Sequence, residues 1–253
     1  MQTILITGAS SGIGAQLAET FARSGVELIL TGRDKARLKR VTSKCEAAGA
    51  KVMSHSLDLT NKTAAHKWFL KISKAHQIDI AIANAGIMEV CGPAGNIETY
   101  NTTERQIDTN LMAPVLIATS LIPAMQERGS GQIVLIASLA GIQPVADVPG
   151  YSASKAGLIA YGEALGNYLH GTGIVVTTIA PGFITTPMTQ AHDSFRPFEI
   201  SAEKAARKIM RAIEKKKSFA AFPLSLELAS RSGRFLPAWL RRITNKPFNF
   251  TQS

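Results

Sequence analysis

The chain has 253 residues, 45% of them apolar and 18% charged, a length that suits one or two domains with a large core. It has only two cysteines, at no metal-ligand spacing, which argues against a disulfide scaffold and favours a reducing compartment. The net charge of +10 belongs to the end of the chain, because residues 201–253 hold 12 Lys/Arg against 3 Asp/Glu, and residues 1–200 hold 16 against 15.

Short apolar runs alternate with helical patterns along residues 1–222. The strand candidates are 3–7, 27–31, 51–56, 78–83, 132–137, 174–179 and 218–222. Several of these runs are almost entirely apolar, as is typical of strands that are covered on both faces. The alternation predicts a single α/β domain, built as a doubly wound parallel sheet with helices on both faces and right-handed crossovers.

Capping residues indicate where the helices begin. Asp34 is the predicted N-cap of one helix, and Thr60 is that of the next. Thr103 with Gln106 forms a predicted capping box before a long apolar helix. The apolar stretch at 111–125 is shorter than the ~18 residues of a membrane span and contains two prolines, so we expect a core helix. We expect no targeting segment, because "MQTILITGAS" leads directly into an apolar strand.

The sequence "TGASSGIG" at 7–14 follows the first predicted strand and opens the first predicted helix. Gly8, Gly12 and Gly14 allow a tight turn and a close approach to a pyrophosphate, which the helix N-terminus would bind. The spacing G-x-x-x-G-x-G differs from the G-x-G-x-x-G fingerprint, and an ordinary strand-to-helix turn is the alternative. Its position at the first strand-to-helix junction favours a dinucleotide site.

The second predicted strand ends in "LTGRD", where dinucleotide-binding proteins usually carry an acid for the ribose hydroxyls. Gly32 takes that place, and Arg33 follows it. The planar guanidinium of an arginine can pair with a 2′-phosphate. We therefore predict that NADP(H) is the preferred cofactor, and Asp34 keeps NAD(H) as the alternative.

The sequence "YSASK" places Tyr151 and Lys155 on one face of a helix. A phenol alone is a poor acid at neutral pH, with a pKa near ~10, and a neighbouring ammonium is expected to lower that pKa. Ser138 stands upstream at the end of the apolar run "QIVLIAS", and strand ends are where open α/β sheets build their sites. The three residues together favour acid–base chemistry over an ordinary surface pair.

The motifs together resemble those of the short-chain dehydrogenase/reductases. The resemblance rests on "TGASSGIG", "DLT" at 58–60, "NAG" at 84–86, Asn110, Ser138, "YSASK" and "PGFITTPM" at 181–188. It covers about residues 1–220, and it implies one Rossmann-type domain with about seven strands at 1–222, followed by an extension at 223–253. It also implies an NAD(P)-dependent enzyme that transfers a hydride between nicotinamide and a carbonyl or alcohol carbon.

The resemblance implies a role for each catalytic residue. Tyr151 would be the general acid in reduction, and Lys155 would lower its pKa and bind the nicotinamide ribose. Ser138 would polarise the substrate oxygen, and Asn110 would hold a water that relays protons to Lys155. The residues that the resemblance assigns to cofactor binding are Gly8, Ser10, Ser11, Gly12, Ile13, Gly14, Arg33, Asp58, Leu59, Asn84, Ala85, Gly86, Tyr151, Lys155, Pro181, Gly182, Ile184 and Thr186.

Within that set, the resemblance places Asp58 by the adenine, Asn84 on the adenosine side and Thr186 by the carboxamide. The chain departs from the family pattern at one position. Many NADPH-using members carry a basic residue where this chain has Ser11. The preference for a 2′-phosphate would therefore rest on Arg33 alone.

The substrate is less well defined by the sequence. Phe183, Met188, Phe195 and Phe198 are candidates for an apolar pocket, and His192 is a candidate for substrate contact. The histidines have no ligand spacing, so we predict no metal site. We predict a lipophilic carbonyl or alcohol as substrate, with a 3-oxoacyl reductase acting on a carrier-bound substrate as the alternative. A nucleic-acid-binding or scaffold protein is a weaker alternative, because residues 1–200 are nearly neutral.

The stretch "FLPAWLRRITNK" at 235–246 combines apolar and basic residues. Leu236, Trp239, Leu240 and Ile243 fall on one helical face. Residues 223–253 would fold over the substrate pocket as a lid, contact another subunit, or lie on an anionic membrane surface. We therefore expect a cytoplasmic protein, either free or peripheral to a membrane. Family resemblance suggests a homo-oligomer that associates through the helices near 103–128 and 151–170.

Overall fold

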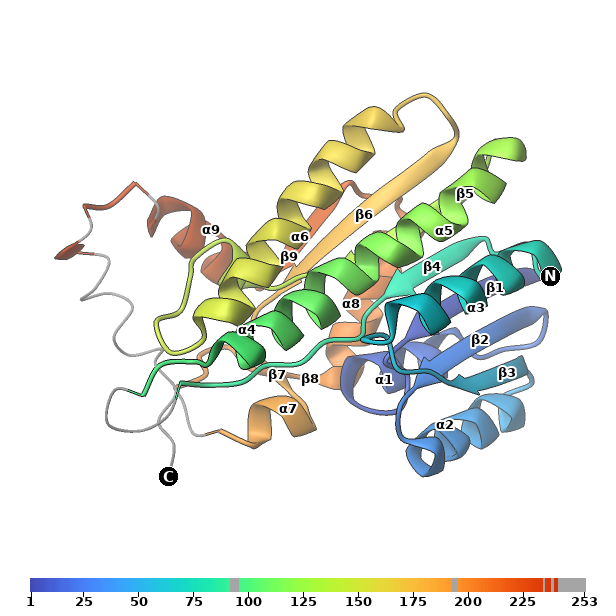
Figure 1. The fold of residues 1–253 in the computed structure, drawn as a ribbon, viewed down its shortest axis with the longest axis horizontal. Coiled ribbons are helices and arrows are strands. Elements are labelled where there is room, and N and C mark those ends of the chain that lie inside the picture. The colour runs from blue at the N-terminus through green and yellow to red at the C-terminus, as the bar shows by residue number, and fades with distance from the viewer. Residues whose placement is uncertain (92–95, 193–194, 234, 238, 241–253) are drawn as a thin grey trace.

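The structure, a computed structural model, describes residues 1–91, 96–192, 195–233, 235–237 and 239–240. Its main sheet has seven parallel strands in the order β3-β2-β1-β4-β5-β6-β9 (Figure 1). The strands are β1 (Gln2–Thr7), β2 (Val26–Gly32), β3 (Lys51–Ser56), β4 (Ile80–Ala83), β5 (Gly131–Ile136), β6 (Ile174–Pro181) and β9 (Phe219–Phe222). The prediction of a doubly wound parallel sheet is confirmed.

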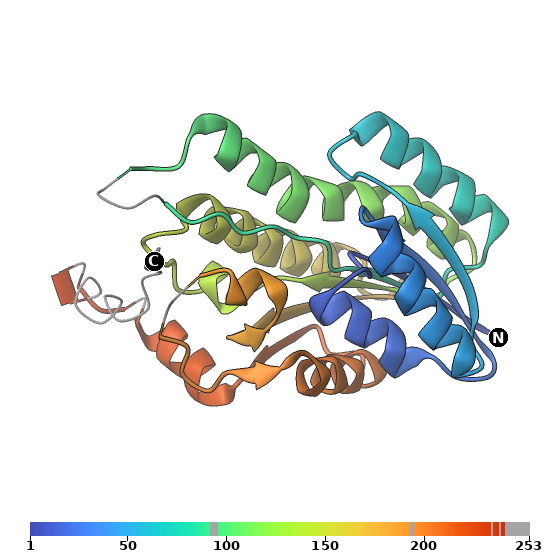
Figure 2. The same ribbon diagram turned by 90° about the horizontal axis from the view of Figure 1, so that it is seen from below.

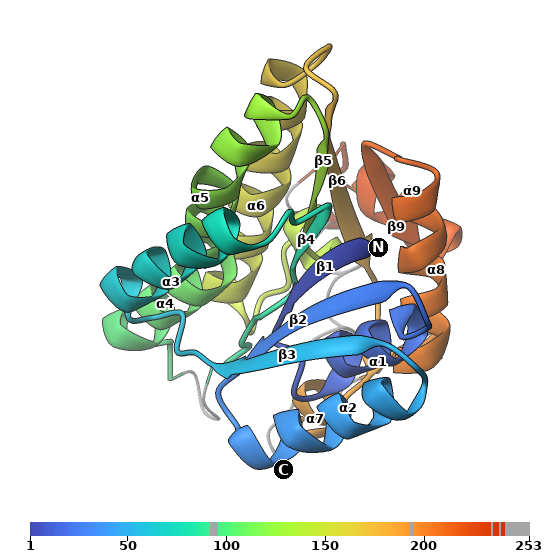
Figure 3. The ribbon, with the colours of Figure 1, turned by 90° about the vertical axis from the view of Figure 1, so that its right-hand side faces the viewer.

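Helices cover both faces of the sheet, which is seen nearly edge-on in Figure 3. One face carries α1 (Gly12–Phe21), α2 (Lys35–Ala47) and α8 (Ala202–Glu214). The other carries α3 (Lys62–Ala75), α4 (Tyr100–Ile107), the π-turn η2 (Asp108–Met112), α5 (Ala113–Glu127) and α6 (Pro149–Tyr168). Strand β2 is buried along its whole length, which explains why Leu28, Ile29 and Leu30 follow one another without alternating polar residues.

Smaller elements follow strands β5, β6 and β9. They are the 3₁₀ turn η3 (Leu139–Gly141), β7 (Ile184–Thr185), α7 (Pro187–Gln190), β8 (Ile200–Ser201) and α9 (Leu224–Gly233). Strand β7 pairs with β8 in a separate two-stranded sheet. In the view from below, the N-terminus lies at one end of the molecule, and α7 and α9 lie toward the opposite end (Figure 2).

The helix starts agree only in part with the prediction. Asp34 is the N-cap of α2, and its side chain accepts a hydrogen bond from the Arg37 backbone N–H, as expected. The N-cap of α3 is Asn61 rather than Thr60. The prediction of Thr60 was wrong because its hydroxyl and its N–H both donate to Asp58 instead, so this threonine belongs to the preceding turn.

The predicted capping box at Thr103 and Gln106 is also wrong. Helix α4 begins earlier, with Thr99 as its N-cap, so both residues lie inside the helix. The Thr103 hydroxyl donates to the carboxylate of Glu98. The Gln106 side chain is fully buried, and its carbonyl accepts from the Glu89 N–H. Thr103 and Gln106 have the spacing of a capping box. Their side chains instead bond to Glu98 and Glu89, which precede the helix.

A continuous helical run extends from Tyr100 to Glu127 through α4, η2 and α5. By length and composition it would be able to cross a membrane, but half of its most apolar window is buried inside the protein. Its α5 segment packs against the sheet and α3. We interpret the run as a core helix, as the sequence predicted for 111–125.

Because all seven strands are parallel, their carboxyl ends meet at one edge of the sheet. The segments "GASS" after β1, "RD" after β2, "DLT" after β3 and "NAG" after β4 all emerge there. Ser138 follows β5 at the same edge. The fold thereby brings Gly8 and Ser138, which are 130 residues apart in the sequence, to one edge of the sheet.

Candidate active site

A cavity of about 620 Å³ lies along the carboxyl edge of the sheet. It is lined by nearly every residue that the sequence assigned to the cofactor, from the glycine turn at 8–13 to Thr186. Gly14 and Asn110 are not among the lining residues. Gly32 and Asp34, which the sequence placed beside the cofactor, and Met188, which it named for an apolar pocket, also line this cavity. The lining residues that sequence reasoning missed are Thr31, Arg37, Leu57, Thr60, Ile87, Thr109, Ile136, Ala137, Pro187 and Thr189.

The glycine turn has the conformation that its sequence suggested. Gly8 and Gly12 have φ values of +66° and +56°, in the left-handed region that favours glycine. A Cβ on Gly14 would overlap the carbonyl oxygen of Gly8 and the amide of Asn84, so Gly14 permits close packing beneath the turn. Its role is therefore structural support for the turn rather than a lining of the cavity.

The first turn of α1 is available to an anion. Ser11 is its N-cap, with an extended backbone, and makes no side-chain capping hydrogen bond. The N–H groups of a helix N-terminus that no side chain caps carry a partial positive charge. Since Ser11, Gly12 and Ile13 line the cavity, this end of α1 fits a phosphate group.

Asn84 holds the turn in place. Its side-chain amide donates to the carbonyl of Thr7 at 2.9 Å, and its backbone N–H donates to the Thr7 hydroxyl at 3.1 Å. These bonds join the end of β1 to the end of β4. Asn84 also lines the cavity, so it can support the nucleotide directly as well as the loop that would hold the phosphates.

The far end of the large cavity is rich in arginine. Gly32 is buried, and a Cβ there would lie 3.0 Å from the side chain of Ser10, which leaves little room for an acid. Arg33 is exposed and lines the cavity together with Arg37. This end of the cavity therefore offers two guanidinium groups.

The carboxylates at this end already have partners. Asp34 accepts from the Arg37 N–H at 2.8 Å and pairs with its Nε at 2.7 Å, and the backbone bond is the main cause that lowers the pKa of Asp34. Asp58 accepts from the N–H and the hydroxyl of Thr60, which lower its pKa in that order. The nearby charge of Arg33 lowers the pKa of Asp58 further.

The three predicted acid–base residues meet where β5 ends and α6 begins. Tyr151 lies in the first turn of α6, and Lys155 follows one turn later on the same face. The Lys155 Nζ lies 5.6 Å from the centre of the Tyr151 ring. The Ser138 side chain is hydrogen-bonded to Tyr151. The helix and the strand end thus bring the three side chains together as the sequence predicted.

The electrostatics of this cluster differ from the expectation. Burial raises the pKa of Tyr151 above its ordinary value, and the hydrogen bond with Ser138 only offsets part of the rise. Lys155 is 4% exposed, and burial lowers its pKa to about 8. Its ammonium donates to the carbonyl of Ile136 at 2.8 Å. In this structure desolvation outweighs any lowering of the Tyr151 pKa by the ammonium.

Asn110 lies just beneath the cluster, in the π-turn η2. Its side chain is fully buried and bonds to both backbone groups of Ile87, at 2.8 and 2.9 Å, and to the Ser154 hydroxyl at 3.0 Å. A Cβ on Gly86 would lie 3.2 Å from the Asn110 oxygen and 3.6 Å from Lys155 Nζ. Gly86 therefore lets the two side chains approach each other, and the predicted proton relay through Asn110 stays a prediction.

A second cavity, of about 370 Å³, opens from the same cluster. It shares Ser138, Tyr151, Gly182 and Thr189 with the larger cavity and is otherwise mainly apolar. Its other lining residues are Met88, Leu139, Ala140, Gln143, Val145, Val148, Phe183, Leu226, Ala229, Ser230, Ser232, Gly233 and Leu236. The last six belong to α9 and the turn after it, so the beginning of the extension at 223–253 forms one wall.

The four residues that the sequence named for an apolar pocket do not line one cavity in the structure. Phe183 lines the smaller cavity and Met188 the larger one. Phe195 and Phe198 are 61% and 62% exposed and line neither cavity. Of the helical face predicted in the tail, Leu236 lines the smaller cavity and Trp239 is 63% exposed. Ile243 and the basic residues from 241 onward lie outside the described residues.

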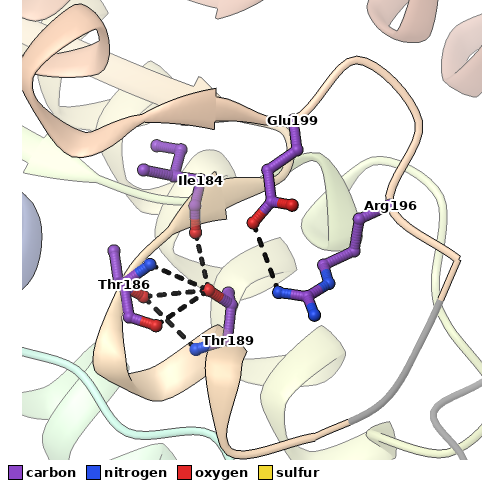
Figure 4. Close-up of polar contacts among 5 residues, drawn as sticks. All are labelled: Ile184, Thr186, Thr189, Arg196 and Glu199. Atoms are coloured by element: carbon purple, nitrogen blue, oxygen red, sulfur yellow. Dashed lines mark hydrogen bonds and ion pairs between the residues drawn. The ribbon is translucent and has the colours of Figure 1, made fainter.

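Thr186 is held in a compact hydrogen-bonded turn (Figure 4). Its hydroxyl accepts from the Thr189 N–H, and the Thr189 hydroxyl bonds to the Thr186 N–H and to the carbonyl of Ile184. These bonds form a capping box at the start of α7. Farther along, Arg196 and Glu199 form an ion pair at 3.2 Å. Thr186 thereby faces the larger cavity from a fixed backbone.

Comparisons with known proteins agree with this geometry. A family model described as short chain dehydrogenase matches residues 2–197. Ketoacyl reductase HetN of Nostoc sp. is 38% identical over 192 residues, which cover 74% of this chain and 66% of that protein.

Two solved structures resemble the chain over its whole length. A short-chain dehydrogenase from Sphingobium yanoikuyae, in complex with NADPH, aligns with a TM-score of 0.83 at 28% identity, covering 100% of this chain and 98% of the other. An alcohol dehydrogenase from Comamonas testosteroni, described as specific for bulky-bulky ketones, aligns with a TM-score of 0.80 at 26% identity. That match covers 100% of this chain and 97% of the other.

Proposed function

The chain belongs to the short-chain dehydrogenase/reductase family and is an oxidoreductase, and on this premise we propose that it reduces the carbonyl of a bulky, apolar substrate with NADPH. One observation carries the proposal. The nucleotide-sized cavity and the apolar cavity share Ser138 and Tyr151, so a cofactor in one and a substrate in the other would meet at the acid–base cluster. The resemblance to the NADPH complex and to the bulky-ketone enzyme supports the same assignment.

The residues of the larger cavity fit an NADP(H) molecule. The uncapped turn of α1 would take the pyrophosphate, and Arg33 would take the 2′-phosphate. Lys155 would bind the nicotinamide ribose, and Thr186 would bind the carboxamide. When bound, NADPH supplies the hydride. The protein supplies orientation, exclusion of water and the proton.

The acid–base cluster favours proton donation. The Ser138 hydroxyl would hold the substrate oxygen, and the Tyr151 hydroxyl would give its proton to that oxygen as negative charge develops. Since burial keeps the pKa of Tyr151 above its ordinary value, the phenol is protonated at neutral pH and ready to act as an acid. The positive charge of Lys155 would then stabilise the phenolate that is left.

A 3-oxoacyl reductase remains the second candidate, and the ketoacyl reductase from Nostoc supports it. A panel of ketones of increasing bulk, with a 3-oxoacyl group attached to a carrier protein as a further substrate, separates the two. We expect kcat/KM with NADPH to rise as apolar bulk increases. A marked preference for the carrier-bound substrate over every free ketone would instead establish the second candidate, and no turnover with either would contradict both.

The arginines beside Gly32 predict the cofactor preference. We expect NADPH to bind more tightly than NADH, and Arg33→Ala to weaken NADPH binding by about 10-fold or more, the worth of one charge-assisted pair, with little change for NADH. Titration of nucleotide fluorescence measures both constants. Arg40→Ala is the matched control, because Arg40 is exposed and does not line the cavity. Equal losses for both nucleotides in Arg33→Ala would show that Arg33 is structural.

We also propose that the protein is a cytoplasmic homo-oligomer whose tail meets an anionic membrane surface. Leu224 and Leu228 lie one turn apart on α9 and are 65% and 57% exposed, and Phe235 beyond the helix is 91% exposed. The same helix lines the apolar cavity. The sequence at 223–253 adds five basic residues against one acid. Exposed apolar side chains in a segment whose sequence is rich in basic residues are typical of interfacial binding.

Co-sedimentation with vesicles tests the membrane proposal. We expect the full chain to bind anionic vesicles at low salt, to bind them less at higher salt, and to ignore neutral vesicles. Changing Leu228 and Trp239 together to Ser should abolish binding without loss of turnover on a soluble ketone. If the full chain stays in the supernatant throughout, the exposed apolar residues have another role. A salt-sensitive shift with DNA would favour nucleic acid instead.

A further inference from the structure

Helix α6, which carries the acid–base pair, begins without a capping side chain of its own. Its N-cap is Val148, which makes no side-chain capping bond. Pro149 follows and has no N–H to donate. The N–H of Gly150 is therefore the first donor of the helix that needs a partner, and Tyr151 is the next residue along.

That partner comes from Glu98, which is 52 residues upstream. Its Oε2 accepts from the Gly150 N–H at 3.0 Å and from the Thr103 hydroxyl at 2.9 Å. Among the described residues its other oxygen, Oε1, is buried without a hydrogen-bond partner. A carboxylate at the positive end of a helix is favourable. Glu98 thus performs from a distant loop the function that an N-cap residue normally performs locally.

The absence of a side chain at Gly150 leaves room for this carboxylate. A Cβ at position 150 would overlap Glu98 Oε2 at a distance that real contacts essentially never show. The same Cβ would lie 2.9 Å from the amide of Gln106, which is itself fully buried. The glycine therefore leaves the space in which the carboxylate reaches the helix end. Two residues far apart in the sequence form one contact.

We propose that Glu98 is a positioning residue for Tyr151, which it serves by fixing the first turn of α6 against Ser138. The inference rests on the proposed role of Tyr151. The reason is geometric: the capped N–H belongs to the residue directly before Tyr151, so loss of the cap frees the turn that aims the phenol. A displacement of about 1 Å in a catalytic group can lower turnover by up to about 100-fold.

The first test compares Glu98→Ala with Glu98→Gln. We expect Glu98→Ala to lower kcat by about 10-fold with the KM for NADPH within about 2-fold, since the larger cavity is untouched. Glu98→Gln should stay within about 3-fold of the parent, because its amide oxygen has two lone pairs for the two donors. Glu104→Ala, on the exposed part of α4, is the control and should change neither constant. Equal losses in the Ala and Gln variants would overturn the proposal.

The second test uses the contact between Glu98 and Gly150. Gly150→Ala should lower kcat as Glu98→Ala does, and the double variant should lose no more than the worse of the two, because one contact is removed in each case. Losses that multiply in the double variant would overturn the proposal. If Glu98→Ala does not fold, Gly150→Ala is tested by itself. A normal kcat in Gly150→Ala would likewise overturn the proposal.

Hydrogen exchange separates this inference from the function on which it rests. Glu98→Ala should speed amide exchange in the peptide that contains residues 150–152, while exchange in the central strands stays unchanged. This readout does not depend on turnover. Unchanged exchange at α6 would contradict the capping role even if Tyr151 is catalytic. Faster exchange in an enzyme whose Tyr151→Phe variant is fully active would uphold the cap and reject the proposed function.

Discussion

Replacing Tyr151 with Phe should lower kcat at least ~100-fold, the usual contribution of a positioned acid, and leave NADPH binding and the fold intact. The substitution removes one hydroxyl. The ring keeps its packing beside Lys155, whose Nζ lies 5.6 Å from the ring centre. Ser138 would still hold the substrate oxygen, but no proton would be delivered as charge develops there.

Steady-state turnover of a bulky ketone, together with NADPH titration and circular dichroism, measures this prediction. Tyr161→Phe is the matched control, because Tyr161 lies on the same helix, is partly buried, and lines neither cavity. We expect that control to keep full activity. Near-normal turnover in folded Tyr151→Phe would reject Tyr151 as the acid and would reopen the choice of proton donor.

Replacing Lys155 with Met should cause a comparable loss of turnover and, at the same time, make the protein more stable at pH 7. Burial lowers the pKa of Lys155 from 10.5 to about 8, which corresponds to about 3 kcal/mol against the charged form. Met removes that cost but leaves the carbonyl of Ile136 without its donor, which offsets about 1–2 kcal/mol. The net gain in the free energy of unfolding should be about 1–2 kcal/mol.

The pH dependence of stability identifies the cause. The unfolded chain holds the lysine proton up to about pH 10.5 and the folded chain only up to about pH 8, so this lysine makes the parent more stable as the pH rises between these values. Urea unfolding of both proteins should therefore show the advantage of Lys155→Met at pH 7 and its disappearance near pH 10. A variant that is less stable than the parent at pH 7 would mean that the ammonium is well compensated in its site.

The sheet could be predicted from the sequence because each strand is recognised by the apolar pattern of its own consecutive residues. Buried strands such as β4, with the sequence IAIA, are continuous apolar runs, and parallel strands place their carboxyl ends at one edge wherever the helices lie. The site motifs directly follow the strands in the sequence, so the sequence alone predicts that they lie close together at one edge of the sheet. Arg37 was not predicted to line the cavity. Its position three residues after the N-cap Asp34 could have placed it beside Asp34, because the N–H at that position bonds to the capping side chain.

Other features depended on contacts between distant segments. Thr60 and Asn61 are both good N-cap residues, and only the bond from Thr60 to Asp58 decides between them. The pKa of Tyr151 was expected to fall because the sequence shows the ammonium but not the burial, which acts in the opposite direction. The cap that Glu98 provides joins segments 52 residues apart and has no local sequence pattern.

The wall that α9 contributes to the apolar cavity has a consequence for how such enzymes diversify. The family model ends at residue 197, whereas this wall is made by residues 226–236. The chain thus encodes this one wall outside the stretch that the family model matches, whereas other lining residues of the apolar cavity, such as Leu139 and Phe183, lie inside it. Recombination or drift confined to the last tenth of the coding sequence can therefore reshape one wall of the apolar cavity while the larger cavity and the acid–base cluster are inherited unchanged.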